Sequence, residues 1–455
     1  MTPPPITAML AELACSAGEA PAPAVESARR SLLDTLAVAV AGMTDPVMAT
    51  LTAWVRTEAA PGPAAVWGSE EAFGIGHAAL LNGTAAHALD WDDAVPSMPM
   101  HPAAVIFPAL LAQAATEPVT GSELAAAFHI GSTATRAVFE VLGVGIHYGR
   151  GWHSTSTVGR IANVMALARL LKLDEKTTRN ALAIAASLAA GSLSNFGTMT
   201  KPLHCGLAAK DALMAVGLAR SGFTGRETQL EDRRGFFAMY GDQDPARLDT
   251  MGKRWAYWSG EWWNDLALKR YPSCFATHKP LDGVLALRDE IGPLDRITDI
   301  EVETRAGYGS PLISHLPTTG LEGKFSMPYT VASALTDGRV SLEHFTDERV
   351  NDPEILPLMK KVRETTGGGE DDPQYAEVRI TRIDGSVVSR RVLVTYGDAT
   401  NPLADHDLKA KFLDATAYAG WAENDAEHLF TTADAAMTSA DLAPLLAALA
   451  RKGNA

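Results

Sequence analysis

The stretch AVESARRSLLDTLAVAVAG at residues 24–42 is dominated by Ala, Leu and Val, and its apolar residues recur at helical spacing. The same texture returns in three later stretches, at residues 122–142, 158–173 and 206–222. Helices that are apolar on most of their faces belong in the interior of a large helical bundle. We therefore predict that residues 22–265 are mainly helical, with helix ends at Gly42 and Gly222 and N-caps at Asp174 and Thr224.

A second texture begins near residue 267. Residues 297–308, 376–382 and 387–396 alternate apolar and polar side chains, which is typical of half-buried strands. The tetrapeptide Ile383-Asp384-Gly385-Ser386 predicts a hairpin turn between the last two strands. Helical patterns persist between the strands, and they dominate again after about residue 402.

These two textures predict a mainly α fold with an α+β second domain. We expect a large all-helical domain from residues 1–266 and 402–455, and a smaller α+β domain from residues 267–401. A chain of 455 residues is long enough for two or three domains, and its 47% hydrophobic content supplies ample core.

Charge and cysteine content restrict the class of function. The formal net charge of −15 argues against a nucleic-acid binder but allows a small anionic substrate in a locally positive pocket. Three cysteines without any CxxC spacing favour a reducing cytoplasm and argue against an iron–sulfur cluster. The first residues do not resemble a signal peptide, and the charge-free stretch 181–200 is rich in Ser, Gly and Thr. We expect a cytoplasmic protein that does not span a membrane, with residues 181–200 forming a buried helix and a loop.

Polar side chains that could carry chemistry collect in five short segments flanked by Gly, Pro or aromatic residues. The segments are residues 87–101, 151–159, 200–206, 269–278 and 324–329. In the first, His87 and Asp90 would share a helix face, and carboxylates follow directly. These acids could orient a histidine or contact substrate, and a solvated charged loop is an equal alternative.

The other four segments combine cations with an imidazole, a thiol or a phenol. His153 precedes an apolar helix, whose free N–H groups would favour an anion, although it could be incidental to a Ser/Thr cap. Lys201 lies beside a charge-free stretch, where a bound carboxylate could pair with it. Lys324 and Lys201 could equally be surface residues with partly buried stems.

Several classes of catalytic site are disfavoured by the sequence. His87, Asp90, Asp92 and His101 could bind a metal, but neither HExxH nor a paired-His spacing occurs. A GxSxG elbow, a GxxxxGK[ST] loop and a GxGxxG turn are also absent. The remaining histidines, lysines and tyrosines favour acid–base catalysis on a small anion, with no metal and no cofactor.

The same segments resemble the MmgE/PrpD family, whose members include 2-methylcitrate dehydratases, cis-aconitate decarboxylases and iminodisuccinate epimerases. Eight stretches match in the family's order: LLDTLAVAVAG at 32–42, HALDWDDA at 87–94, HPAAVIFPALLA at 101–112, GWHSTSTVGRIA at 151–162, KPLHCGLAAKDAL at 201–213, GFTG at 222–225, KRYPSCFATHKPLD at 269–282 and GKFSMPYTVASAL at 323–335. The resemblance implies a metal-independent, cofactor-free homodimer with a helical domain, a smaller α+β lid and an active site between them.

The resemblance also implies site residues. The decarboxylase branch places active-site residues at the positions of Asp90, His101, His153, Lys201, Lys269 and Tyr329. That branch has a histidine where this chain has Cys274, and a threonine where this chain has Ala94. The loop before His101 is one residue longer here. These differences argue against decarboxylase activity and leave the substrate open.

The resulting hypothesis is proton abstraction next to a carboxylate of a small di- or tricarboxylate. Catalysis is assigned to Asp90, His101, His153, Cys274 and Tyr329, and substrate binding to Lys201, His204, Lys269 and Arg270. Either His101 or His153 would be the base, and Asp90 would orient a histidine. Tyr329 or the second histidine would then protonate the leaving hydroxyl or return the proton to carbon.

The first expectation for the reaction is a hydro-lyase acting on a tricarboxylate such as 2-methylcitrate. An epimerase or isomerase of a small dicarboxylate, to which Cys274 could contribute an acid or base, is the second. A decarboxylase of the cis-aconitate type is a further alternative. A catalytically silent helical binding protein is the most distant one.

Overall fold

The computed structural model describes residues 4–305, 311–369 and 373–450 of the chain. It divides the chain into two compact units. Unit 1 consists of Met1–Ser194, Met199–Leu268 and Ala404–Ala455. Unit 2 consists of Asn195–Thr198 and Lys269–Leu403.

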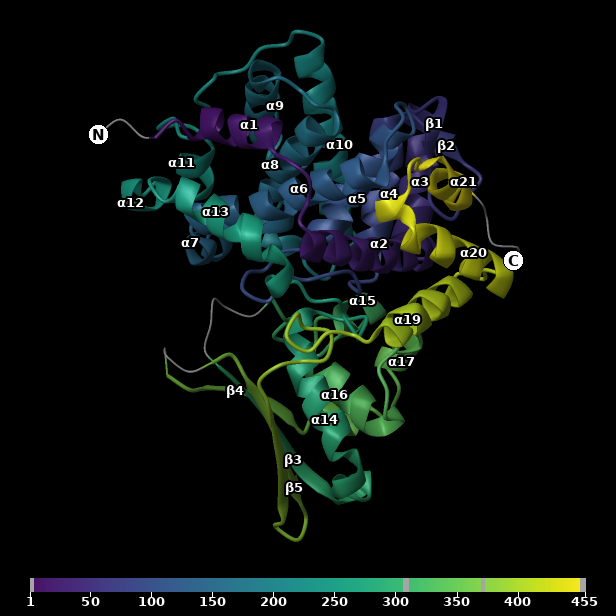
Figure 1. Cartoon of the computed structure of the whole chain (residues 1–455). Coiled ribbons are helices and arrows are strands. Elements are labelled where there is room, and N and C mark those ends of the chain that lie inside the picture. The colour runs from purple at the N-terminus through teal and green to yellow at the C-terminus, as the bar shows by residue number, and fades with distance from the viewer. Residues whose placement is uncertain (1–3, 306–310, 370–372, 451–455) are drawn as a thin grey trace. The chain divides into compact units, whose positions relative to one another are not determined.

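Unit 1 is built from helices (Figure 1). From the N-terminus they are α1 (Ile6–Ser16), α2 (Ala22–Gly42), α3 (Pro46–Glu58), α4 (Ile75–Ala88), α5 (Pro102–Ala114), α6 (Gly121–Leu142), α7 (Val144–Gly149), α8 (Ser154–Leu170), α9 (Glu175–Leu188), α10 (Thr200–Arg220), α11 (Phe236–Tyr240), α12 (Pro245–Leu248) and α13 (Met251–Glu261). The C-terminal segment adds α19 (Asp405–Tyr418), α20 (Glu423–Asp434) and α21 (Ala443–Leu449).

The centre of unit 1 is formed by α4, α5, α8 and α10. Almost all residues of α5 and α8 are buried, as are most residues of α4 and more than half of those of α10. Small side chains allow α4 and α10 to pack closely. A Cβ atom on Gly83 of α4 would lie 2.9 Å from the Cα atom of Gly206 in α10. This close approach brings the C-terminal end of α4 near the first turn of α10.

The helical spacing of apolar residues predicted most helices of unit 1 correctly, with local exceptions. Asp174 caps α9 by accepting a hydrogen bond from the Thr177 N–H, as expected. Thr224 caps no helix, because irregular backbone and turns follow it and the next helix, α11, begins only at Phe236. Gly42 is the last residue of α2, and Gly222 follows α10 with φ of 89°.

Two short strands in unit 1 were not predicted. They are β1 (Pro61–Ala65) and β2 (Ala72–Phe73), which pair antiparallel. The stretch 181–200 forms the second half of α9 and a loop, as expected.

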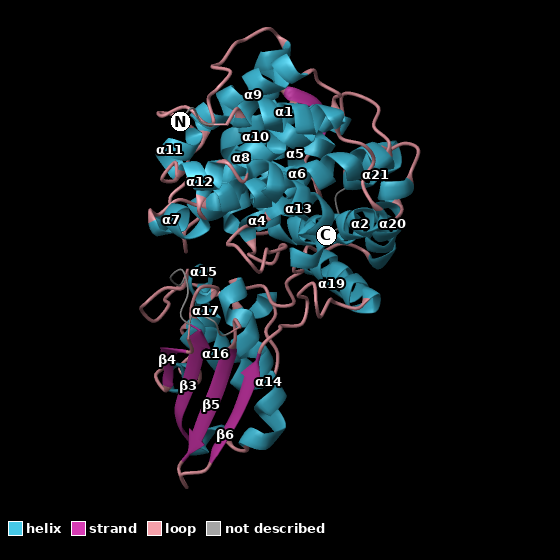
Figure 2. Cartoon of the chain, turned by 60° about the vertical axis from the view of Figure 1, so that its left-hand side comes forward, coloured by secondary structure: helices cyan, strands magenta, loops and turns pink. Residues whose placement is uncertain are grey.

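Unit 2 contains a four-stranded mixed sheet in the order β4-β3-β5-β6 (Figure 2). Its strands are β3 (Ile297–Arg305), β4 (Val362–Gly367), β5 (Ala376–Arg382) and β6 (Val387–Val392). β3 pairs parallel with β4 and antiparallel with β5, and β5 pairs antiparallel with β6. The predicted hairpin between β5 and β6 is confirmed, with Gly385 at φ of 81°.

Helices complete the core of unit 2. α14 (His278–Ile291) and α16 (Met327–Asp337) share one apolar cluster with the buried side chains of β3 and β5. The shorter helices are α15 (Gly320–Gly323), α17 (Asp347–Val350) and α18 (Leu356–Met359). β4 was not predicted, because its sequence VRETTG lacks apolar alternation. The end of the predicted strand at residues 306–308 lies outside the described residues.

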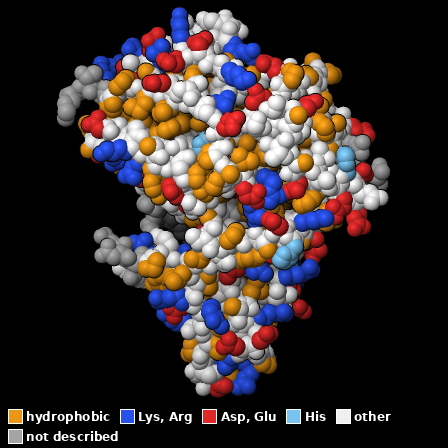
Figure 3. Space-filling view, in the orientation of Figure 1, with side chains coloured by type: hydrophobic (Ala, Val, Ile, Leu, Met, Phe, Trp, Pro, Cys, Tyr) orange, Lys and Arg blue, Asp and Glu red, His pale blue; other side chains and the backbone are white. Residues whose placement is uncertain are grey.

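On the face shown in Figure 3, Lys and Arg side chains are interspersed with Asp and Glu. Such mixing differs from the continuous basic surface of a nucleic-acid binder. Among the described helices, none alone has both the length and the apolar composition to cross a bilayer. Helices α2 and α3 meet these criteria only as a pair, and the pair is bent by 82°.

Candidate active site

The ends of four helices bring the chemistry-bearing side chains of unit 1 together. His101 is the N-cap residue of α5, His153 is the N-cap residue of α8, and Lys201 lies in the first turn of α10. His87 lies in the last turn of α4, with its ring centroid 4.6 Å from that of His101 and 6.2 Å from that of His153. Because helix N-termini carry partial positive charge, this arrangement favours an anion.

A buried hydrogen-bonded chain runs through His87. Its Nδ1 lies 2.8 Å from Asp92 Oδ2, and its Nε2 lies 2.8 Å from Lys201 Nζ. An ammonium group can only donate, so His87 Nε2 accepts and the hydrogen of the neutral ring is on Nδ1, where it donates to Asp92. Burial lowers the pKa of His87, which agrees with a neutral imidazole.

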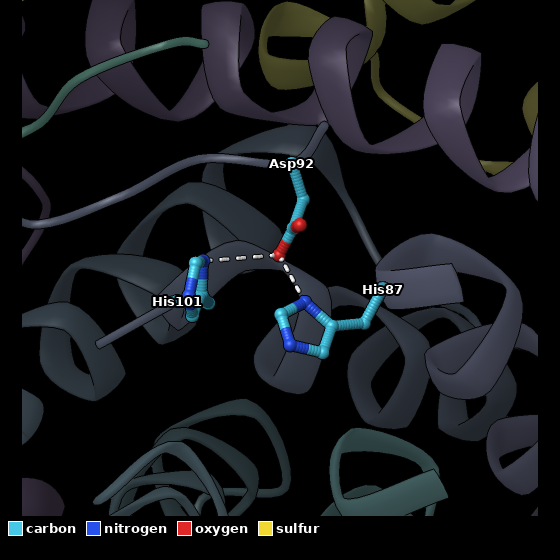
Figure 4. A group of neighbouring side chains, drawn as sticks. All are labelled: His87, Asp92 and His101. Carbon is cyan, nitrogen blue, oxygen red and sulfur yellow. Dashed lines mark hydrogen bonds and ion pairs between the residues drawn. The ribbon is translucent and has the colours of Figure 1, made fainter. Parts of the chain in front are cut away.

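The Asp92 carboxylate also faces a second imidazole, that of His101. Its Oδ2 is 3.4 Å from Nδ1 of His101, and Figure 4 shows both rings pointing at the same carboxylate oxygen. His101 Nδ1 also lies 2.7 Å from the backbone carbonyl of Asp93, to which it donates. These contacts place the hydrogen of a neutral His101 on Nδ1, so that Nε2 carries the lone pair.

Asp93 holds the start of α5 in place. Both of its carboxylate oxygens accept from the Ala103 N–H, at 3.2 and 3.1 Å. Burial raises the pKa of Asp93 well above its ordinary value, and the neighbouring Asp92 charge adds to that effect. Asp93 therefore fixes the helix end that carries His101.

His153 pairs with the buried His204 of α10. Their Nδ1 atoms lie 3.0 Å apart, so one ring must donate and the other accept. Burial lowers the pKa of His153 well below its ordinary value, and it lowers the pKa of His204 to about 4. Both rings are therefore neutral near pH 7.

Asp90 has a different place from the one predicted. α4 ends at Ala88, and Asp90 has φ of 53°, so it does not share a helix face with His87. Its Oδ1 lies 2.5 Å from Lys201 Nζ. The left-handed conformation turns the carboxylate toward α10. The carboxylate that orients a histidine is Asp92, and Lys201 is paired with a protein carboxylate.

A metal ion fits this cluster poorly. The ligand atoms of His87, Asp92 and His101 all lie within 4.8 Å of one another. However, His87 already donates to Asp92, and its other nitrogen faces the Lys201 ammonium at 2.8 Å. A divalent cation would have to displace that hydrogen and lie near an existing positive charge.

Four of the predicted site residues belong to unit 2. Lys269 and Cys274 are buried, and the Cys274 N–H donates to the Lys324 carbonyl at 2.9 Å. Arg270 lies 3.6 Å from Asp282 and packs against the rings of Tyr271 and Tyr396.

Tyr329 of unit 2 is fully buried in α16. Its hydroxyl donates to the backbone carbonyl of His344. Burial raises the pKa of its phenol to about 12. The structure thus gives this hydroxyl a structural partner, and catalysis by Tyr329 stays a prediction from the resemblance.

The sequence reasoning missed His87 and Asp92 as site residues. Both occur in the segment His87-Ala-Leu-Asp90-Trp-Asp92-Asp93, which was singled out, but a continuous helix was assumed there. A helix end at Ala88 places Asp92, five residues after His87, back against the imidazole. Two acids directly after the Trp were the available signal for a turn.

Comparison with known proteins shows the family. Residues 8–249 match the MmgE/PrpD N-terminal domain and residues 271–435 match the MmgE/PrpD C-terminal domain. The chain belongs to the MmgE/PrpD family, as the sequence motifs predicted.

Curated relatives of this chain include cis-aconitate decarboxylases from three organisms. The cis-aconitate decarboxylase of Mus musculus is 29% identical over 418 residues, covering 85% of this chain and 81% of that protein. The cis-aconitate decarboxylase of Homo sapiens is 28% identical over 411 residues, covering 85% and 82%. That of Aspergillus terreus is 24% identical over 422 residues, covering 86% and 85%.

Proposed function

We propose that the protein is a lyase that acts on a small di- or tricarboxylate by proton transfer at a carbon next to a carboxylate. The observation that carries the proposal is the convergence of His101, His153 and Lys201, each at the N-terminal end of a helix, around the His87–Asp92 pair. The helix ends and the ammonium supply positive potential for a polyanion, and the imidazoles supply acids and bases.

His101 is the proposed base. Its hydrogen is held on Nδ1 by the Asp93 carbonyl, so Nε2 can accept a proton from carbon. Asp92 Oδ2 lies 3.4 Å from Nδ1 of His101, and its negative charge stabilises the imidazolium that forms. In other enzymes with a histidine base, a carboxylate in the same way orients the ring and stabilises the imidazolium.

The His153–His204 pair is the proposed acid. If His204 donates through Nδ1, His153 carries its own hydrogen on Nε2 and can deliver it to a leaving group. After water has left, the proton that His101 took from carbon returns through the site to the His153–His204 pair, so that all three imidazoles are neutral again. Lys201 and the helix ends stabilise the charge that develops on the substrate carboxylate.

Two reactions are compatible with this machinery. In a dehydration, His101 removes a proton from carbon and His153 protonates the hydroxyl that leaves as water. In a decarboxylation, carbon dioxide leaves and an imidazolium delivers a proton to carbon. Dehydration of a citrate-type substrate is our first proposal, because Cys274 stands where the decarboxylase branch has a histidine. Decarboxylation of cis-aconitate is the second, favoured by the names of the relatives.

Further properties stay proposals from the family. We propose a metal-independent and cofactor-free enzyme, supported by the Lys201 ammonium beside His87. We also propose a cytoplasmic homodimer. Lys269, Arg270, Cys274 and Tyr329 remain candidates for substrate binding and catalysis. An epimerase of a small dicarboxylate uses the same proton abstraction without elimination.

Proton NMR in deuterium oxide tests the proposal. The purified protein is incubated with 2-methylcitrate, citrate, cis-aconitate and a chiral dicarboxylate. A new olefinic signal from citrate, or replacement of the methyl doublet of 2-methylcitrate by a downfield methyl singlet, indicates a hydro-lyase, and carbon dioxide release from cis-aconitate indicates a decarboxylase. Deuterium incorporation with loss of optical activity indicates an epimerase. If no substrate is converted or exchanged at high enzyme concentration, the proposal is wrong for this substrate class.

A further inference from the structure

A buried ion pair lies directly behind the acidic turn of the candidate site. Nζ of Lys411, in α19, is 2.6 Å from Asp34 Oδ1 of α2 and 2.8 Å from the backbone carbonyl of Trp91. The Lys411 side chain is 5% exposed and that of Asp34 is 0% exposed. The ammonium also lies 4.8 Å from the centroid of the Trp91 ring.

The position of Trp91 gives this contact its significance. Trp91 is flanked by Asp90, which binds Lys201, and by Asp92, which binds His87. The peptide that Lys411 holds therefore connects the two carboxylates of the site. Three segments that are distant in the sequence, α2, the turn after α4 and α19, meet at one ammonium group.

We propose that Lys411, held by Asp34, is a positioning residue for the Asp90–Trp91–Asp92 turn. This inference rests on the proposed function, since it assigns Lys411 a role in the same site. Burying a lysine and an aspartate is costly unless both are paired, and an apolar pair of similar volume would serve packing alone equally well. An ammonium can in addition fix a backbone carbonyl, which an apolar side chain cannot do.

Loss of the Lys411 contact is expected to lower the turnover rate. Asp90 Oδ1 lies 2.5 Å from Lys201 Nζ, and Asp92 Oδ2 lies 2.8 Å from His87 Nδ1. A small displacement of the turn therefore weakens the contact of Asp90 with Lys201 and that of Asp92 with His87. A misplacement of about 1 Å costs about a hundredfold in rate. Substrate affinity depends on the helix ends and on the Lys201 ammonium, which are all retained, and changes less.

The test compares four proteins: the wild type, Lys411→Arg, the double variant Asp34→Asn with Lys411→Met, and Lys409→Met. The double variant removes both charges, so no unpaired carboxylate is left to unfold the protein. Lys409 is the matched control on the same helix, because it pairs with Glu427 at 2.9 Å and its side chain is 41% exposed. The measurements are kcat, KM and hydrogen–deuterium exchange over residues 89–101.

The proposal predicts that the double variant loses about a hundredfold in kcat with KM little changed, and exchanges faster at residues 89–101. It also predicts that Lys409→Met behaves as wild type and that Lys411→Arg lies between them. Wild-type kcat or unchanged exchange at residues 89–101 in the double variant overturns it. If the wild type itself converts no substrate, the proposed function has failed, and the exchange of residues 89–101 alone decides whether Lys411 holds the turn.

Discussion

Nδ1 of His153 lies 3.0 Å from Nδ1 of His204, so the two buried imidazoles share a single hydrogen between these atoms. The pair has two neutral arrangements, which differ in whether His153 carries its other hydrogen on Nε2 or has a lone pair there. His204 therefore sets the protonation state in which His153 meets substrate.

Replacing His204 with Ala is expected to lower kcat by about a hundredfold, the scale of one general acid or base. The physical reason is that His153 loses the partner that fixes its tautomer. Steady-state kinetics on the substrate found by NMR measure the effect. His406→Asn, at an exposed position on α19, is the control. Unchanged kcat in His204→Ala would remove His204 from the mechanism.

Buried neutral histidines predict a protein that is less stable in acid. Burial lowers the pKa of His129, His147 and His204 to about 4, whereas an unfolded histidine titrates near 6.5. Between these values the unfolded state binds more protons, so the free energy of unfolding falls as the pH is lowered. This stabilisation is complete above about pH 6.5 and is lost as the pH falls toward about 4.

Urea unfolding at about pH 7.5 and about pH 5 measures this dependence. Asp93 and Glu364, whose pKa values are raised by burial, act in the opposite direction, but they are outnumbered by the buried histidines. A free energy of unfolding that is constant or larger at the lower pH would contradict neutral burial of the histidines.

Close packing of α4 against α10 predicts a sharp difference between two glycines of α10. A methyl group on Gly206 would overlap the Leu80 carbonyl oxygen and Thr84 Oγ1, whereas one on Gly217 would meet no atom within 4 Å. We expect Gly206→Ala to destabilise the protein by about 1–3 kcal/mol and to reduce activity, because it separates His87 from Lys201. Gly217→Ala is expected to stabilise by about 0.5–1 kcal/mol.

Thermal unfolding and kcat of the two glycine variants test this relationship. Equal melting temperatures for Gly206→Ala and Gly217→Ala would show that the two helices can separate without cost. A destabilised Gly206→Ala with full activity would show that the His87–Lys201 contact does not matter for turnover.

The sequence predicted the helices and strands in which apolar residues recur at a clear spacing. The helices of unit 1 and the strands β3, β5 and β6 have clear apolar patterns, and residues 376–382 coincide with β5. β4 was missed because its residues are polar and its pairing with β3 is parallel, between segments far apart in the chain. Local patterns carry little information on such pairing.

The sequence predicted several residues of the candidate site but not how they are connected. His101, His153, Lys201 and His204 were identified from their segments, and the structure brings them together. Which carboxylate meets which imidazole depends on the left-handed residue Asp90, whose conformation redirects the chain after α4. The contact with a histidine that was expected of Asp90 is made by Asp92, and Asp90 pairs with Lys201.

The most direct test of the account is the rate of His101→Asn on the substrate that the wild type converts, with circular dichroism to confirm folding. A base that Asp92 supports from behind predicts a loss of about a hundredfold or more in kcat, with the folded spectrum retained. If folded His101→Asn turns over close to the wild-type rate, proton abstraction by this imidazole is excluded, and the central claim fails.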